Sequence, residues 1–203
     1  MGTVVFAFVI GFLFAFAIFV PSFEWLLHRH TMHTEKTWWL FKDLYRLHDQ
    51  THHIAYDYNE HYTKPEAAMR QAPSLMEGLS FNGWFMVGIV GIHGVFYLLG
   101  LLPFAFFIDW KILVITLFGA LAGSGAFGFL QIKFHYWYHA DDGFGYKTLA
   151  RLPIAGQYFL YMCKHHRLHH EDTSNNLNTL VPTVDLAISW LRRLFGFTLR
   201  ATP

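Results

Sequence analysis

The segment His165-His166-Arg167-Leu168-His169-His170 places four imidazoles within six residues. Residues three and four apart share a face of a helix, so His166 lies beside both His169 and His170, whereas His165 lies beside His169 alone. Protonated imidazoles packed together would repel one another, but neutral imidazoles around a metal ion satisfy their ring nitrogens. The segment therefore predicts a metal-binding helix face.

Three further histidine clusters have spacings that suit metal ligands. His48 and His52 are four residues apart and share a helix face, and His135 and His139 have the same spacing. His28 and His33 are five apart and converge only if their rings lean together. One structural zinc site uses four ligands, so the larger set predicts two metal ions with positions left for water, oxygen or substrate. The predicted ligands are His28, His33, His48, His52, His53, His135, His139, His166, His169 and His170.

The other histidines match these spacings less well. His61 and His93 match no cluster, so we expect ordinary polar roles for them, although His93 lies within an apolar segment where an ionisable group normally has a partner or a function. His30 and His165 lie inside clusters but off the preferred spacing. Whether His30, His165 or His93 joins the site is left open.

The composition predicts an all-α integral membrane protein, because 54% of the residues are hydrophobic and 19% are aromatic. Val4 to Val20 is an apolar run that ends at Pro21, beyond which the helix can continue. Phe81 to Ile108 and Ile112 to Ile132 carry no formal charge. The short link Asp109-Trp110-Lys111 makes these two segments an antiparallel hairpin, which gives three predicted spans.

The hairpin returns the chain to the side on which the first span delivers the early histidines. Of fifteen Lys and Arg residues, only Lys111 falls in the opposite turn, which favours a cytoplasmic histidine cluster. Small residues allow helices to approach closely in membranes. The residues expected to do so in the third span are Gly119, Gly123, Gly125 and Gly128.

The last segment, Leu186 to Leu199, predicts an amphipathic helix at the membrane interface, with Arg192, Arg193 and Arg200 facing outward. No Lys/Arg stripe interleaved with aromatic residues is present, and the net charge is +1, so nucleic acid is not an expected partner. Cys163 is the only cysteine, which excludes an intrachain disulfide and argues against a thiolate metal site.

The four histidine clusters, their order and the intervening hairpin resemble the fatty acid hydroxylase superfamily of membrane histidine-box di-iron hydroxylases, which includes sterol- and carotenoid-oxidising relatives. Glu24 to His33 resembles the family's first box, and Asn176 to Asp185 resembles the Pro-containing tail after its last box. The second cluster departs from the pattern, because three residues separate His48 and His52 where the family often has two.

The resemblance implies a non-haem centre of two iron ions at the cytoplasmic membrane face. Such a centre activates O2 to insert oxygen into a C–H bond of a lipid-like substrate of the fatty acyl, sterol or carotenoid type. Zinc is an alternative occupant in a purified sample. Electrons would come from an external donor, namely a ferredoxin, a cytochrome b5 or a reductase.

These expectations combine into a single domain over residues 1–203, with three spans and a cytosolic histidine-rich di-metal cap. A fourth re-entrant or interfacial element near Ile154 to Met162 is an alternative. We expect polar neighbours to orient the imidazoles. The candidates are Glu24, Asp49, Asp141, Asp142, Glu171 and Asn176.

Two other functions remain open. A membrane lipid desaturase would use the same histidine boxes to remove two hydrogens. A membrane metal transporter or a metal-binding structural protein would also combine spans with many histidines, but transport ligands should lie within the spans, where only His93 is found.

Overall fold

The computed structural model describes residues 2–35, 45, 48–53, 83–139 and 144–195. This part of the chain forms helices and turns without a strand, so the predicted all-α class is confirmed for it. The chain divides into two compact units: the first comprises Met1–Val20 and Gly78–Leu130, and the second comprises Pro21–Glu77 and Gln131–Pro203. The single domain over residues 1–203 stays a prediction.

The first helical stretch is continuous from Gly2 to Met32. It contains α1 (Gly2–Phe14), the π-helical turn η1 (Ala15–Phe19), α2 (Val20–Leu27) and a second π-helical turn, η2 (His28–Met32). Pro21 lacks an N–H and crowds the preceding turn, and the π-helical hydrogen bond from Val20 N–H to Ala15 O lies directly before it. The expected continuation of the helix past Pro21 is confirmed.

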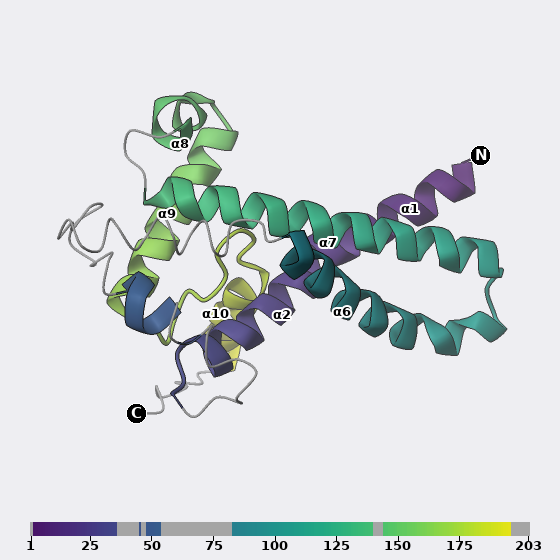
Figure 1. Cartoon of the computed structure of the whole chain (residues 1–203). Helices are drawn as coiled ribbons and strands as arrows, with labels where there is room; N and C mark the ends of the chain where they lie inside the picture. The colour runs from purple at the N-terminus through teal and green to yellow at the C-terminus, as the bar shows by residue number, and fades with distance from the viewer. Residues whose placement is uncertain (1, 36–44, 46–47, 54–82, 140–143, 196–203) are drawn as a thin grey trace. The chain divides into compact units, whose positions relative to one another are not determined.

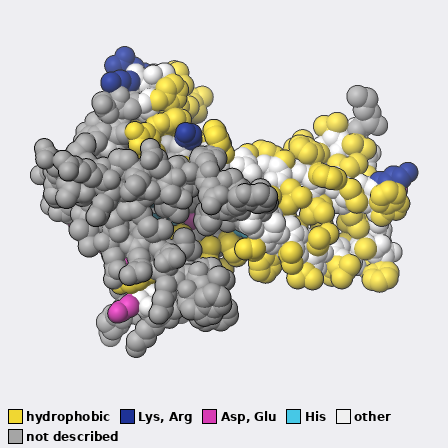
Figure 2. Space-filling view, viewed as in Figure 1, with side chains coloured by type: hydrophobic (Ala, Val, Ile, Leu, Met, Phe, Trp, Pro, Cys, Tyr) yellow, Lys and Arg dark blue, Asp and Glu magenta, His cyan; other side chains and the backbone are white. Residues whose placement is uncertain are grey.

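The predicted hairpin consists of α6 (Gly83–Leu101), a 3-10 turn η5 (Leu102–Phe106) and α7 (Trp110–Tyr138) (Figure 1). Two helices, Gly2–Met32 and Trp110–Tyr138, are long and apolar enough to cross a membrane. The described apolar stretch in α6 is the shorter Val90–Phe106, so the third span stays a prediction. Hydrophobic side chains cover much of the visible surface of these helices, as Figure 2 shows.

Within the first unit, α1 and α7 meet backbone to backbone. A Cβ on Gly119 would overlap the carbonyl oxygen of Phe8, and a Cβ on Gly123 would lie 2.5 Å from that of Phe12. Gly11 makes the reciprocal approach to α7. The expected packing role therefore holds for Gly119 and Gly123 but not for Gly125, where an added Cβ would meet nothing within 4 Å.

The second unit adds η4 (His48–His52), α8 (Phe144–Lys147), η6 (Leu149–Arg151), α9 (Ala155–Glu171) and α10 (Thr183–Phe195). Phe159 and Met162 of α9 are fully buried against Tyr138 and Cys163. Burial raises the pKa of the Cys163 thiol to about 12, so the thiol stays protonated at neutral pH. The segment suggested as a fourth membrane element thus supplies part of this core.

The final helix begins at Thr183, earlier than expected, and is amphipathic. Arg193 is exposed as predicted. The outward orientation predicted for Arg192 is wrong, because this side chain is half-buried and lines a cavity. Arg200 lies outside the described residues.

Substitution of Gly119 by Ala tests the close contact between α1 and α7. Ala is the better helix former, by about 1 kcal/mol, but the added methyl would collide with the backbone of α1. We expect Gly119→Ala to lower the free energy of unfolding by about 1–3 kcal/mol in a denaturant titration in detergent micelles. Gly125→Ala is the matched control and should be neutral or slightly stabilising; equal losses in both variants would contradict the packing role.

Candidate metal centre

Four chain segments deliver the ten predicted ligands to one place in the second unit. His28 begins η2 and His33 follows it, while η4 and the next residue carry His48, His52 and His53. The end of α7 and the residue directly after it provide the third pair, and the last turns of α9 provide the final three residues. These last five residues are His135, His139, His166, His169 and His170.

The rings form two groups. The ligand atoms within each group lie within 4.8 Å of one another, so each group could hold a metal ion. The first group is His28, His33, His48, His53 and His169, and the second is His52, His135, His139 and His166. His170 lies against both, because its Nε2 is 3.1 Å from that of His166 and its ring stacks on His53 at 4.2 Å.

Hydrogen bonding between the rings does not explain their arrangement. The Nε2 atom of His166 lies 3.1 Å from that of His135, 2.9 Å from that of His139 and 3.1 Å from that of His170. A neutral imidazole nitrogen donates one hydrogen or accepts one, in the ring plane, so it cannot serve three such neighbours. Metal–nitrogen bonds of about 2.0–2.1 Å place adjacent ligand nitrogens roughly 3 Å apart, so the residues present fit a metal ion.

In the first group, His48 likewise makes close Nε2–Nε2 contacts with more than one ring. Its Nε2 is 2.7 Å from Nε2 of His28 and 3.2 Å from Nε2 of His53. His33 and His169 make a further Nε2 contact of 3.1 Å. His48, which departs from the family spacing, therefore lies at the centre of its group.

The π-helical turns explain the spacing of five residues. In a π-helix the hydrogen bond runs from i to i+5, which brings residues five apart onto one face. His28 and His33 bracket η2 and stack at 5.1 Å, and His48 and His53 bracket η4 with ring centroids 4.9 Å apart. The expectation from α-helical spacing paired His48 with His52, but the structure assigns these neighbours to different groups.

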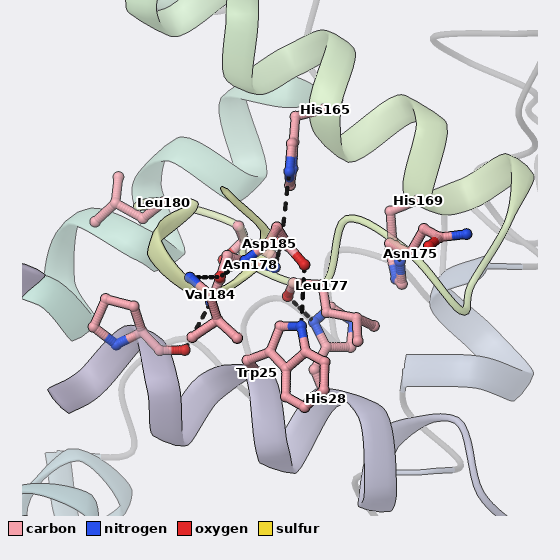
Figure 3. Close-up of polar contacts among 12 residues, drawn as sticks. Trp25, His28, His165, His169, Asn175, Leu177, Asn178, Leu180, Val184 and Asp185 are labelled. Carbon is pink, nitrogen blue, oxygen red and sulfur yellow. Dashed lines mark hydrogen bonds and ion pairs between the residues drawn. The ribbon is translucent and has the colours of Figure 1, made fainter. Parts of the chain in front are cut away.

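Backbone carbonyls orient two of the buried rings (Figure 3). His28 Nδ1 donates to Leu177 O at 2.5 Å, and His169 Nδ1 donates to Asn175 O at 2.9 Å. A carbonyl oxygen can only accept, so each Nδ1 carries the proton and each Nε2 keeps its lone pair for the centre. Sequence reasoning missed these partners because a backbone carbonyl carries no residue-type signal.

Asp49 plays the corresponding role for His33, whose Nδ1 lies 2.8 Å from Asp49 Oδ1. Burial lowers the pKa of His33, while the hydrogen bond and negative charge of Asp49 oppose that shift. The carboxylate also strengthens His33 as an electron-pair donor. Among the predicted orienting residues that the structure describes, Asp49 is therefore the one within hydrogen-bond distance of a predicted ligand.

Burial keeps the cluster neutral. Desolvation, followed by repulsion from neighbouring imidazoles, lowers the pKa of three rings of the cluster well below the ordinary value. These rings are His48, His52 and His166. Neutral imidazole is the form that binds metal, so the site is competent for metal at neutral pH.

The histidines left open by the sequence lie elsewhere. His30 is exposed, and His165 Nε2 lies 3.5 Å from Asp185 Oδ2, outside both groups. His93 is buried in the first unit with its ring 5.5 Å from that of Phe19. His61 falls outside the described residues.

The remaining orienting candidates contact no histidine of the two groups in the described part of the chain. Glu24 is buried and accepts hydrogen bonds from Thr179 N at 3.0 Å and from Gln131 Nε2 at 2.7 Å. Glu24 therefore positions the loop that carries Leu177 O, and it does not orient a histidine directly. Glu171 and Asn176 line a neighbouring cavity, and Asp141 and Asp142 fall outside the described residues.

Comparisons with protein-family models, with curated proteins and with solved structures find no match to this chain.

Metal content tests the two groups. We expect His48→Ala to weaken binding at the first group by more than the roughly 10–100-fold loss that follows removal of an outer partner, because a ligand itself is lost. The measurement is metal per chain by mass spectrometry after equilibration with a buffered metal series. His30→Ala is the control and should match the parent protein; a parental metal content in His48→Ala would contradict the assignment.

Asp49→Asn tests the orienting carboxylate. Loss of the negative charge should lower metal affinity about 10-fold while leaving the amount bound at saturation unchanged. The same metal titration measures both quantities. Glu35→Gln is the control. It removes an exposed carboxylate two residues after His33 and should leave the metal affinity unaltered.

Proposed function

We propose that this protein is a membrane non-haem di-iron hydroxylase that inserts oxygen into a C–H bond of a lipid-like substrate. The observation that carries the proposal is the convergence of ten imidazoles into two adjoining groups, each of a size that could hold one metal ion. The sequence resemblance to the fatty acid hydroxylase superfamily supplies the identity of the metal and the reaction. The apolar helices support a membrane location.

Two iron ions held by these residues would supply the activation of O2. The overall reaction would place one oxygen atom in the C–H bond and release the other as water, with two electrons from the external donor and two protons from solvent. A ferredoxin, a cytochrome b5 or a reductase would fill the donor role. The lipid-like substrate would reach the site from the surrounding membrane lipids.

The chain's own residues would orient the ligands, exclude water and offset part of the charge of the ions. Leu177 O, Asn175 O and Asp49 hold their histidines in one tautomer, so the coordinating nitrogens face inward without reorganisation. Burial of His28, His166 and His169 would keep water away from these ligands. Among the described residues, Asp49 is the carboxylate that is hydrogen-bonded to a ligand of the two groups, so it would offset part of the positive charge of the ions.

The desaturase alternative would use the same ligands, and product mass separates the two reactions. The transporter alternative receives less support, because the ligands of both groups lie in the second unit and not in the apolar first unit.

We propose that the cluster faces the cytoplasm, from the charge distribution in the sequence.

Reconstituted activity tests the function. Purified protein loaded with ferrous iron anaerobically, then given O2, a reductant system and extracted membrane lipids, should yield products heavier by one oxygen atom. His169→Ala should reduce turnover at least about a thousandfold because a metal ligand is lost, whereas His30→Ala should retain it. Loss of two hydrogens from the product would indicate the desaturase, and iron binding without any oxidised product would indicate a structural metal site.

A further inference from the structure

Two rings of the first histidine group have outward nitrogens with fixed acceptors (Figure 3). Nδ1 of His28 donates to Leu177 O at 2.5 Å. Nδ1 of His169 donates to Asn175 O at 2.9 Å. Because these carbonyl oxygens only accept, both rings carry the proton on Nδ1 and keep the Nε2 lone pair free before any metal ion is bound.

The loop that supplies these carbonyls is itself held in place. Leu177 and Asn178 are fully buried. Asn178 N donates to Asp185 Oδ2 at 2.8 Å, and the hydroxyl group of Tyr138 donates to Thr179 O at 2.9 Å. The acceptors of the first group therefore need little rearrangement when its rings bind a metal ion.

Asp49 adds a negative charge to the support of the first group. Its Oδ1 lies 2.8 Å from Nδ1 of His33, which belongs to this group. A carboxylate in that position raises the basicity of the ligating ring and offsets part of the charge of a bound cation. Three of the five rings of the first group thus have an oxygen partner on the outward nitrogen.

His166 of the second group lacks such a partner in the described part of the chain. Its side chain is fully buried, and no hydrogen-bond partner reaches its Nδ1. Its Nε2 lies 2.9 Å from Nε2 of His139 and 3.1 Å from those of His135 and His170. The nitrogen that faces the other rings is therefore Nε2, and the outward nitrogen is the one without an acceptor.

This difference affects the position of a proton. A ring that binds a metal ion through Nε2 must carry its proton on Nδ1. In the metal-free chain, His166 can carry the proton on Nε2 and donate it to Nε2 of His139. Metal binding requires the proton on Nδ1 of His166, and a buried donor without an acceptor is costly. His28 and His169 need no such change.

We propose that the two groups bind metal with unequal affinity, so that the first group fills first and the second group fills last. Outer partners of ligating histidines typically change metal affinity about 10–100-fold, so the two dissociation constants should differ by at least about 10-fold. This difference presupposes the metal centre proposed above, but it holds whether or not that centre oxidises a lipid.

A metal titration of the purified full-length chain in detergent tests the proposal. Metal-free protein is titrated with Co²⁺ against a competing chelator, because imidazole binds Co²⁺ and the bound ion absorbs visible light. Native mass spectrometry counts the ions per chain at each point. The parent protein should bind one ion per chain in a first step and the second ion at least about 10-fold more weakly.

Matched variants assign the two steps. His48→Ala removes a ring from the first group and should abolish or strongly weaken the first step. His139→Ala removes a ring from the second group and should weaken the second step while leaving the first unchanged. Asp49→Asn should narrow the separation between the steps about 10-fold, because it weakens the first step alone.

Nitrogen-15 NMR of histidine-labelled protein tests the proton positions directly. His28 and His169 should show a proton on Nδ1 both without metal and with two Zn²⁺ ions bound. His166 should move its proton from Nε2 to Nδ1 only when the second ion binds. Single His→Gln substitutions assign the three signals.

Several results would overturn the unequal affinities. They are equal dissociation constants, uptake of both ions in a single step, or a first step that His139→Ala removes and His48→Ala retains. Absence of bound Co²⁺ would overturn the metal centre as well, whereas two-step binding without an oxidised product would overturn the hydroxylase alone. Circular dichroism monitors folding, and Asp49→Asn decides the assignment if a histidine variant does not fold.

Discussion

Three imidazoles of the cluster, those of His28, His33 and His169, point Nε2 inward and pair Nδ1 with an oxygen outside it, and these pairings organise the second unit. An inward Nε2 needs an Nδ1–H with an acceptor, which His28 finds at Leu177 O and His169 finds at Asn175 O. Both carbonyls lie on the loop between α9 and α10. The first histidine group therefore depends on a segment that contributes no histidine to it.

Glu24 is the anchor of that segment. Its buried carboxylate accepts from Asn178 Nδ2, from Thr179 and from Gln131, which ties the loop to α2 and to the end of α7. Asn178 Oδ1 in turn accepts from Val184 N at 3.2 Å and caps α10. A buried acid with several donors is costly to disturb, so the metal groups and α10 share one support.

The first unit has a different source of stability. Its surface is rich in exposed aliphatic and aromatic side chains, so the removal of apolar side chains from water contributes little to its stability. Gly11, Gly119 and Gly123 instead let α1 and α7 approach to backbone contact, which maximises dispersion between the helices. This unit suits a lipid environment, consistent with the two helices long enough to cross one.

The gathering of the histidines could be predicted from the sequence alone. Histidine count and spacing identified all ten rings that converge, because imidazole clusters have few other physical explanations, and apolar run length identified the helices of the first unit. Which ring joins which group was decided by the π-helical turns, whose i to i+5 geometry overrode α-helical spacing at His48 and His52. The orienting carbonyls and the inward Arg192 also required the tertiary structure, because they arise from contacts between residues distant in sequence and leave no mark on local periodicity.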